Sequence, residues 1–230
     1  MIKKTAIAFA TSILLGAGAS LTALPAVAAD APVKAEQVKS LPNIAILATG
    51  GTIASRGSGS LSLTDYGVGS GHKPVGIEVL TDAVPEIKNF ANITGEQIFN
   101  VGSSKLSVAN ELTLAKRINE FLAKKDVDGI VVTHGTDTLE ETAYFLNLVV
   151  KSDKPVVLVG SMRPATGLSA DGPLNLVNAV ALAASPEAKG KGVMVSMNDK
   201  IGSAFGVTKT NTTNLATFQC PDTGCLGIMQ

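Results

Sequence analysis

Three short segments of the sequence carry hydroxyl, carboxylate or ammonium side chains next to glycines. Thr52 ends the run Thr-Gly-Gly-Thr, and Thr136 and Asp137 lie in Thr-His-Gly-Thr-Asp, while Lys209 lies in Val-Thr-Lys-Thr. A threonine hydroxyl becomes a nucleophile only when a base removes its proton. The serine-hydrolase signature Gly-x-Ser-x-Gly is absent, and a lysine whose pKa is lowered by burial is another candidate base. These residue types are compatible with nucleophilic chemistry at a threonine, with Lys209 as the candidate base.

Each of these residues also has an ordinary structural interpretation. Thr52 is of a type that often occupies a turn or caps a helix, and Asp137 would make a good N-cap for the helix expected after it. A lysine such as Lys209 is more commonly a solvated surface charge. His134, between an expected strand and a turn, is more commonly structural than catalytic. Taken singly, the residues leave both interpretations open.

The elements that would position these residues alternate along the chain. Apolar runs typical of buried strands are followed by longer amphipathic segments typical of helices. Ser107 could cap a helix over residues 108–125, and the apolar residues that recur there at helical spacing are Leu112, Ala115, Ile118, Phe121 and Leu122. The other expected helices are residues 138–150 and 174–184, and the expected strands are 43–48, 97–101, 129–133, 155–159 and, closing the series, 192–197. This alternation predicts an α/β fold with a parallel sheet covered on both faces.

Small residues and hydroxyls recur where four of the expected strands end. Ligands of such sheets bind beyond the carboxyl ends of the strands, and glycine lets the backbone approach a ligand closely. The sequence therefore predicts a binding crevice at this edge. The four strand ends are residues 49–52, 102–104, 133–137 and 160–163.

Composition and missing motifs exclude several classes of function. The 19 basic and 19 acidic side chains of the 230 residues balance, so the chain has neither a basic nucleic-acid arm nor an acidic tail. It has no Trp and two Tyr, too few for an aromatic platform that binds sugars or single strands. The dinucleotide fingerprint and the Walker A motif are absent. No zinc-ligand spacing occurs either, so we expect no metal.

The first 29 residues have the three parts of a secretory signal peptide. Lys3 and Lys4 form a positive n-region, residues 5–24 are apolar and small, and Ala-Val-Ala at residues 26–28 is a cleavage signal. The alternative is a membrane anchor, but the glycine, serine and proline content and the Ala-Val-Ala end favour cleavage. Residues 30–40 are polar and predict a linker. We expect a soluble protein exported to a bacterial periplasm, without membrane attachment after cleavage.

The two cysteines say little about the fold or the function. An exported protein can form disulfides, and Cys220 and Cys225 are the only pair available. A bridge between them would close a small loop and stabilise little beyond the tail. We therefore expect no structural role for either cysteine.

Taken together, the motifs resemble those of the type II bacterial L-asparaginases, including the glutaminase-asparaginases. The ordered set TGGTIA, HGTDT, MRP, SADGP and TKTN carries the resemblance, with TDYGVG and NVGS beside it. The resemblance implies a flavodoxin- or Rossmann-like N-terminal catalytic domain over residues 41–230. It also implies hydrolysis of the side-chain amide of asparagine, and often of glutamine, with release of ammonia and without metal or organic cofactor.

The resemblance assigns catalytic roles to five residues. Thr52 would attack the amide carbon, and Tyr66, on a flexible loop that closes over the site, would help position or activate Thr52. Thr136, Asp137 and Lys209 would form a second cluster that relays protons or activates water.

Substrate binding follows from the same resemblance. Ser103 would hold the α-carboxylate of the amino acid, and Asp137 its α-ammonium group, with Gly51, Ser104 and Thr136 completing the expected binding set. A zwitterion needs hydroxyl and N–H donors at one end and a carboxylate at the other, which this set supplies. Ser104 stands where many relatives have Gln or Glu, so the preference between asparagine and glutamine stays open.

Members of the family continue into a second, smaller α/β domain, through which they form homotetramers. The sequence ends at Gln230, and we expect the C-terminal domain to be missing from it. The family usually carries an arginine where Phe205 and Gly206 stand here. Three hypotheses result: an asparagine and glutamine amidohydrolase, a truncated, inactive amino-acid-binding remnant of such an enzyme, or a nucleotide-binding domain, which the missing fingerprints disfavour.

Overall fold

The structure is a computed structural model, and it describes residues 40–66 and 74–230. The predicted signal peptide and all of the predicted linker except Ser40 lie outside the described residues, so both stay predictions. In the part of the chain that is described, no helix has the length and apolar character needed to cross a membrane.

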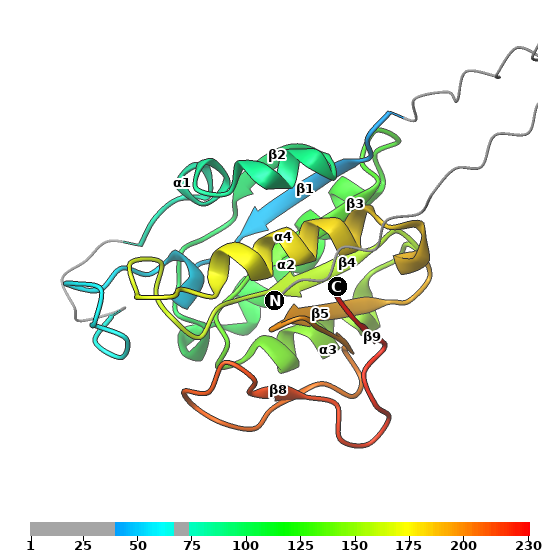
Figure 1. Cartoon of the computed structure of the whole chain (residues 1–230). Coiled ribbons are helices and arrows are strands. Elements are labelled where there is room, and N and C mark those ends of the chain that lie inside the picture. Colours follow the sequence, from blue (N-terminus) through cyan, green and yellow to red (C-terminus); the bar gives the residue numbers. More distant parts are fainter. Residues whose placement is uncertain (1–39, 67–73) are drawn as a thin grey trace, which may run out of the picture. The chain divides into compact units, whose positions relative to one another are not determined.

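A seven-stranded sheet forms the centre of the described part (Figure 1). Its strands, in spatial order, are β2 (Asn92–Gln97), β1 (Asn43–Ala48), β3 (Gly129–Thr133), β4 (Val156–Val159), β5 (Val193–Met197), β6 (Lys200–Ser203) and β9 (Gly227–Ile228). The first five are parallel, and their order, 2-1-3-4-5, is that of flavodoxin. In this order β2 lies on one side of β1, and β3 and the later strands lie on the other. The carboxyl ends of β1 and β3 therefore flank the crevice where ligands bind.

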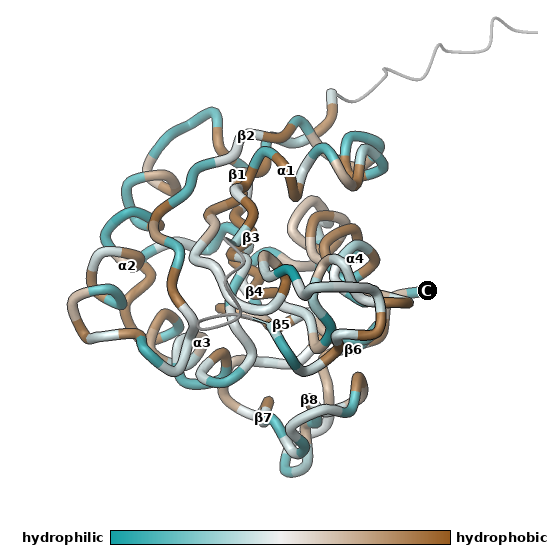
Figure 2. Tube along the Cα trace, turned by 90° about the vertical axis from the view of Figure 1, so that its left-hand side faces the viewer, coloured by the Kyte–Doolittle hydropathy of each residue, from teal (hydrophilic) through white to brown (hydrophobic). Residues whose placement is uncertain are grey.

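Helices cover both faces of the sheet, as the sequence predicted. They are α1 (Ile77–Asp82), α2 (Val108–Leu122), α3 (Leu139–Val149) and α4 (Gly172–Ala184). Successive side chains of a strand point to opposite faces, so Leu47 and Val132 pack in the cluster of α2 and α3, whereas Ile46 and Val131 pack in the cluster of α1 and α4. Figure 2 shows α2 and α3 on one side of the strands and α4 on the other.

The sheet continues beyond the strand that was expected to close it. Asn198 and Asp199 have φ angles of 48° and 64°, the left-handed conformation of a tight hairpin turn. They return the chain as β6, antiparallel to β5, and β9 then pairs antiparallel with β6. The sheet is therefore mostly parallel, as predicted, but the expectation that residues 192–197 close the series of strands was wrong, although Asn-Asp was an available turn signal.

The prediction for the second strand was also wrong. It was expected at residues 97–101, but β2 spans Asn92–Gln97 and residues 98–101 form the loop after it. The strand lies at the sheet edge and is largely exposed, so its sequence Asn-Ile-Thr-Gly-Glu-Gln needs no apolar run.

The start of α2 matches its prediction closely. The Ser107 side chain accepts a hydrogen bond from the Asn110 backbone N–H, and the Asn110 side chain accepts from the Ser107 backbone N–H, which forms a capping box. Leu112 was expected to be buried and is 57% exposed, while Leu114 is buried instead. The other expected core residues of this helix are buried, namely Ala115, Ile118, Phe121 and Leu122.

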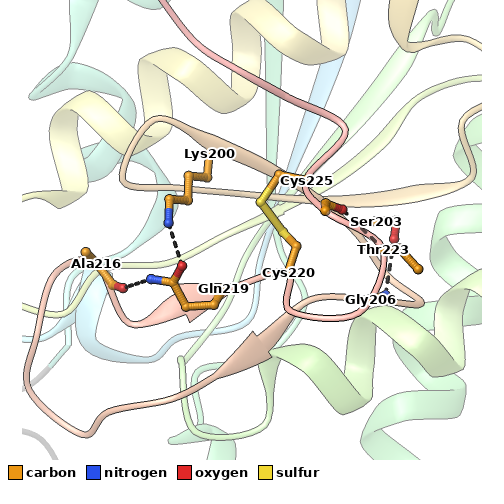
Figure 3. Close-up of a disulfide and its surroundings, with 9 residues drawn as sticks. Lys200, Ser203, Gly206, Ala216, Gln219, Cys220, Thr223 and Cys225 are labelled. Atoms are coloured by element: carbon orange, nitrogen blue, oxygen red, sulfur yellow. Dashed lines mark hydrogen bonds between the residues drawn. A yellow bond between two sulfur atoms is a disulfide. The ribbon is translucent and has the colours of Figure 1, made fainter.

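The two cysteines form a disulfide, which corrects the expectation that neither has a structural role (Figure 3). A short antiparallel ribbon joins β7 (Thr208–Lys209) to β8 (Phe218–Gln219), and Cys220 follows β8 directly. The chain then turns back toward β9, which brings the Cα atoms of Cys220 and Cys225 to 5.2 Å, within disulfide range. Sequence spacing alone could not show this turn. The disulfide therefore lies in the segment that connects β8 of the ribbon to β9 at the edge of the sheet.

Candidate active site

A pocket of about 420 Å³ lies at the carboxyl ends of β1 and β3, at the point where the strand order reverses. Its volume is in the range of small-molecule sites. All of the predicted site residues except Lys209 line it, namely Gly51, Thr52, Tyr66, Ser103, Ser104, Thr136 and Asp137. The structure thus brings together residues that the sequence separates by up to 86 positions.

Lys209 contacts two residues that line this pocket, Thr136 and Asp137. The Lys209 Nζ donates to Thr136 Oγ1 and to Asp137 Oδ1, both at 2.9 Å. Its side chain is only 14% exposed, whereas that of Asp137 is 62% exposed. The alternative that Lys209 is a solvated surface charge is therefore wrong. A lysine ammonium held this way can exchange a proton with a hydroxyl on one side while a carboxylate balances its charge on the other.

Asp137 does not cap the helix that follows it. The N-cap of α3 is Thr138, and no side chain makes a capping hydrogen bond there. The Asp137 carboxylate instead forms the ion pair with Lys209, so the N-cap interpretation was wrong because this distant partner competes for the same side chain.

Glu140, in the first turn of α3, holds the strand that carries the lysine. One carboxylate oxygen accepts from Thr208 Oγ1 at 3.0 Å, and the other accepts from the Lys209 backbone N–H. This two-point contact fixes the direction in which the Lys209 side chain leaves β7. The sequence reasoning missed Glu140, because an acidic residue in a first helical turn is ordinary.

Thr52 is held more loosely. It begins a short 3-10 helix, Thr52–Ala54, that directly follows the glycines after β1. Its Oγ1 donates to Tyr66 Oη at 3.5 Å, at the outer limit for a hydrogen bond. Tyr66 is anchored in turn by a bridge between its backbone and that of Gly57. Both residues line the pocket, so a carbonyl could reach Thr52 from within it.

Glycines let the strand ends approach each other without intervening side chains. Gly51 has a φ of +85°, and a Cβ added there would lie 2.3 Å from the Gly135 Cα. A Cβ at Gly135 would lie 2.6 Å from the Ser103 Oγ. No side chain fits at either glycine. The pocket floor is therefore made of backbone, which can offer N–H donors to an oxyanion or a carboxylate.

Ser103 ties two walls of the pocket together. Its Oγ accepts from the Asp137 backbone N–H at 3.1 Å, and its carbonyl accepts from Thr138 Oγ1 at 3.1 Å. Ser103 is buried, whereas the neighbouring Ser104 is exposed at the pocket wall. The loop after β2 and the end of β3 are thus one rigid unit.

His134 lies behind the pocket rather than in it. It is fully buried, and burial lowers the pKa of its imidazole to about 4 although a hydrogen bond to the Gly135 carbonyl opposes the shift. Its Nδ1 donates to that carbonyl at 2.7 Å. These contacts agree with the structural interpretation of this histidine. In the described part of the chain, no cluster of three His, Cys, Asp or Glu side chains could hold a metal ion.

The fold and the site define a doubly wound α/β domain with a pocket of threonines and glycines at its switch point and a largely buried lysine against that pocket. Residues 43–230 match the family described as "Asparaginase, N-terminal", and the chain belongs to this asparaginase family.

Curated relatives agree with this family. The L-asparaginase 2 of Bacillus subtilis (strain 168) is 62% identical over 193 residues, which cover 84% of this chain and 50% of that protein. The glutaminase-asparaginase of Pseudomonas fluorescens biotype A is 51% identical over 206 residues, covering 90% and 55%. The chain therefore spans about half the length of the curated relatives it matches.

Among solved structures, the chain is similar to a probable cytoplasmic L-asparaginase from Campylobacter jejuni. The TM-score is 0.78 at 54% sequence identity, and the match covers 82% of this chain and 56% of the other. At this identity the likeness supports both the fold and the family.

Proposed function

We propose that the protein hydrolyses the side-chain amide of L-asparagine to L-aspartate and ammonia, with L-glutamine as a second substrate of the same site. The observation that carries the proposal is the contact of the Lys209 Nζ with Thr136 Oγ1 and Asp137 Oδ1, both at 2.9 Å, at the wall of a pocket that also contains Thr52. Family membership and relatives named as asparaginases and glutaminase-asparaginases support it.

In the first step, Thr52 Oγ forms a bond to the amide carbon and gives up its proton. The tetrahedral intermediate then breaks its carbon–nitrogen bond, and the nitrogen takes a proton and leaves as ammonia. In the second step, water attacks the acyl ester on Thr52, which frees the new carboxyl group and restores the threonine hydroxyl. No metal or cofactor enters this chemistry.

The Thr136–Lys209–Asp137 cluster is assigned to proton movement in both steps. A hydroxyl hydrogen-bonded to a lysine provides a path along which one proton can arrive and another depart. Asp137 keeps a negative charge beside the ammonium while this happens. Tyr66, 3.5 Å from Thr52, is assigned to positioning or activating the nucleophile.

The two ends of an amino acid suit the two sides of the pocket. The backbone around Gly51 and the side chains of Ser103 and Ser104 offer donors to an α-carboxylate, and the exposed Asp137 carboxylate offers a partner to an α-ammonium group. This orientation would place the side-chain amide between Thr52 and Thr136.

The compartment and the assembly stay predictions with their own tests. The N-terminal sequence predicts export to a periplasm, which fractionation by osmotic shock would check. The resemblance predicts a homotetramer, which light scattering on the purified protein would check.

The direct test is ammonia release from asparagine and from glutamine by the wild type and by Thr52→Ala. Release by the wild type that falls at least about 10³-fold in the variant is the expected result. Thr113→Ala is the matched control, because Thr113 is an exposed threonine of α2 outside the pocket. Asparagine binding by calorimetry without any turnover would contradict the proposal and favour the inactive binding remnant.

A further inference from the structure

A hydrogen-bonded chain of three polar side chains, two of them fully buried, runs from the back of the pocket to α2. The His134 ring lies between the Gly135 carbonyl, 2.7 Å from Nδ1, and Thr142 Oγ1, 3.0 Å from Nε2. Thr142 Oγ1 also lies 2.7 Å from Glu111 Oε1. His134 and Thr142 are both fully buried. None of these three side chains lines the pocket or enters the chemistry proposed above.

Counting hydrogens along this chain shows that one is missing if Glu111 is ionised. The Gly135 carbonyl can only accept, so His134 Nδ1 must carry a hydrogen. A neutral imidazole then has a bare Nε2, which must accept from Thr142. The Thr142 hydroxyl has a single hydrogen to donate, and an ionised Glu111 would also need it. One of the two short contacts would then join two lone pairs.

The extra proton could sit on either end of the chain, on His134 or on Glu111. A cationic His134 would be wholly buried, and no carboxylate of the described residues contacts it. Burial strongly disfavours such a charge, in keeping with a pKa lowered to about 4. Burial also raises the pKa of the Glu111 carboxyl, and the negative charge of Glu141 on α3 raises it further, against the lowering effect of the Thr142 hydrogen bond. Burial and the charge of Glu141 thus both oppose the ionisation of Glu111.

The second carboxyl oxygen of Glu111 gives an independent reason. Glu111 Oε2 is buried and has no hydrogen-bond partner among the described residues. An unpaired oxygen of an ionised carboxylate costs far more to bury than the carbonyl oxygen of a neutral acid. Both arguments place the proton on Glu111.

From this geometry we infer that Glu111 is a neutral carboxylic acid at neutral pH and a positioning residue for the strand end that carries Thr136 and Asp137. Its proton is donated to Thr142, whose hydroxyl donates to His134, whose ring donates to the Gly135 carbonyl. Because α2 begins just after the Ser103–Lys105 segment, the chain links the two pocket walls from behind. The catalytic consequence rests on the proposed function, whereas the protonation state does not.

Infrared difference spectra of the wild type and Glu111→Gln test the proton directly. The expected result at neutral pH is that the variant loses a carbonyl band of a protonated carboxylic acid. Glu120→Gln is the matched control, since Glu120 is an exposed α2 glutamate paired with Arg117, and it should lose carboxylate bands only. Loss of carboxylate bands in Glu111→Gln would overturn the proposal, whether or not the protein is active.

Kinetics test the positioning role. A glutamine amide can still donate to Thr142, so Glu111→Gln should retain kcat within about twofold at neutral pH, while Thr142→Val should lower kcat about tenfold with little change in KM. At alkaline pH the wild type should lose activity as Glu111 ionises, and Glu111→Gln should lack this limb. An unchanged kcat in Thr142→Val, or the same alkaline limb in Glu111→Gln, would overturn the positioning role.

Discussion

The two threonines of the pocket differ in how firmly they are held. Thr136 is buried, and its hydroxyl accepts from a largely buried lysine at 2.9 Å. That lysine is fixed by Asp137 and, through its backbone, by Glu140. Thr52 begins a single 3-10 turn, and its hydroxyl has a contact of 3.5 Å with Tyr66. The firmly held side of the pocket, with Thr136 and Lys209, is thus part of the sheet and α3. The loosely held side, with Thr52 and Tyr66, is formed by a loop.

This difference separates two tasks of the proposed reaction. Proton transfer depends steeply on donor–acceptor distance, so a preorganised cluster such as Thr136–Lys209–Asp137 suits it. Bond formation at the amide carbon requires the nucleophile to move toward its target, which a loosely held hydroxyl permits. We therefore expect substitutions on the firmly held side to cost more than the substitution of Tyr66.

Among the substitutions that test this comparison, the largest expected effect is that of Lys209→Met, which removes the ammonium but keeps an apolar stem of similar length. Without it Thr136 loses its proton partner, and kcat/KM for asparagine should fall about 10³-fold. Lys200→Met is the matched control, because Lys200 bonds Gln219 outside the pocket (Figure 3) and should retain activity. A loss below about tenfold in Lys209→Met would remove the lysine from the proposed relay.

The second prediction concerns the acid stability of the firmly held side. Folded His134 has a pKa of about 4, below its ordinary value of 6.5, so between these values the unfolded chain takes up a proton that the folded one does not. Stability from the neutral ring is present above pH 6.5 and is lost as pH falls toward 4, by about 3 kcal/mol in total.

Denaturant unfolding of the wild type and of His134→Asn across this range measures the effect. The asparagine side chain at position 134 of the variant can still donate to the Gly135 carbonyl but does not titrate. The difference in unfolding free energy between the two proteins should therefore shrink as pH falls. A difference that stays constant from pH 7 to 4 would show that the ring is not held neutral.

The third prediction concerns a substitution that loosens the firmly held side without changing Thr136, Lys209 or Asp137. Glu140→Gln leaves one amide oxygen to accept a hydrogen bond where the carboxylate accepted two, from Thr208 and from the Lys209 backbone. The lysine should be less well aimed, and kcat should fall about 30-fold with a smaller change in KM. Glu120→Gln, at an exposed glutamate of α2 outside the pocket, is the control. Equal behaviour of the two variants would contradict the positioning of β7 by Glu140.

The strands could be predicted from the sequence where burial is complete, whereas the predictions failed at the edges of the sheet. The strands at 43–48 and 129–133 lie in the middle of the sheet, buried on both faces, so their apolar runs mark them clearly. At the edges, β2 is exposed and β6 and β9 are short. Edge strands need few apolar residues, so composition does not reveal them.

The candidate site divides in a similar way. Motifs brought Thr52, Thr136 and Lys209 together as hypotheses, and the structure gathers them at one place, although 73 positions separate Thr136 from Lys209. Glu140 and Glu111 were missed because each looks like a surface charge of a helix. Their partners come from other elements, 69 and 31 positions away, and only the tertiary structure shows such pairs.

The smallest expected effect is that of Tyr66→Phe, on the loosely held side. If the 3.5 Å contact persists during the reaction, the hydroxyl contributes little, and kcat should fall only about tenfold. Tyr144→Phe is the matched control, since Tyr144 lies on α3 outside the pocket. A loss equal to that of Lys209→Met would contradict the comparison, because the Tyr66 hydroxyl would then have to shorten its contact with Thr52 once substrate binds, as catalytic hydrogen bonds that are long in a free enzyme can do. A smaller loss would agree with the comparison, in which the firmly held lysine contributes more than the Tyr66 hydroxyl.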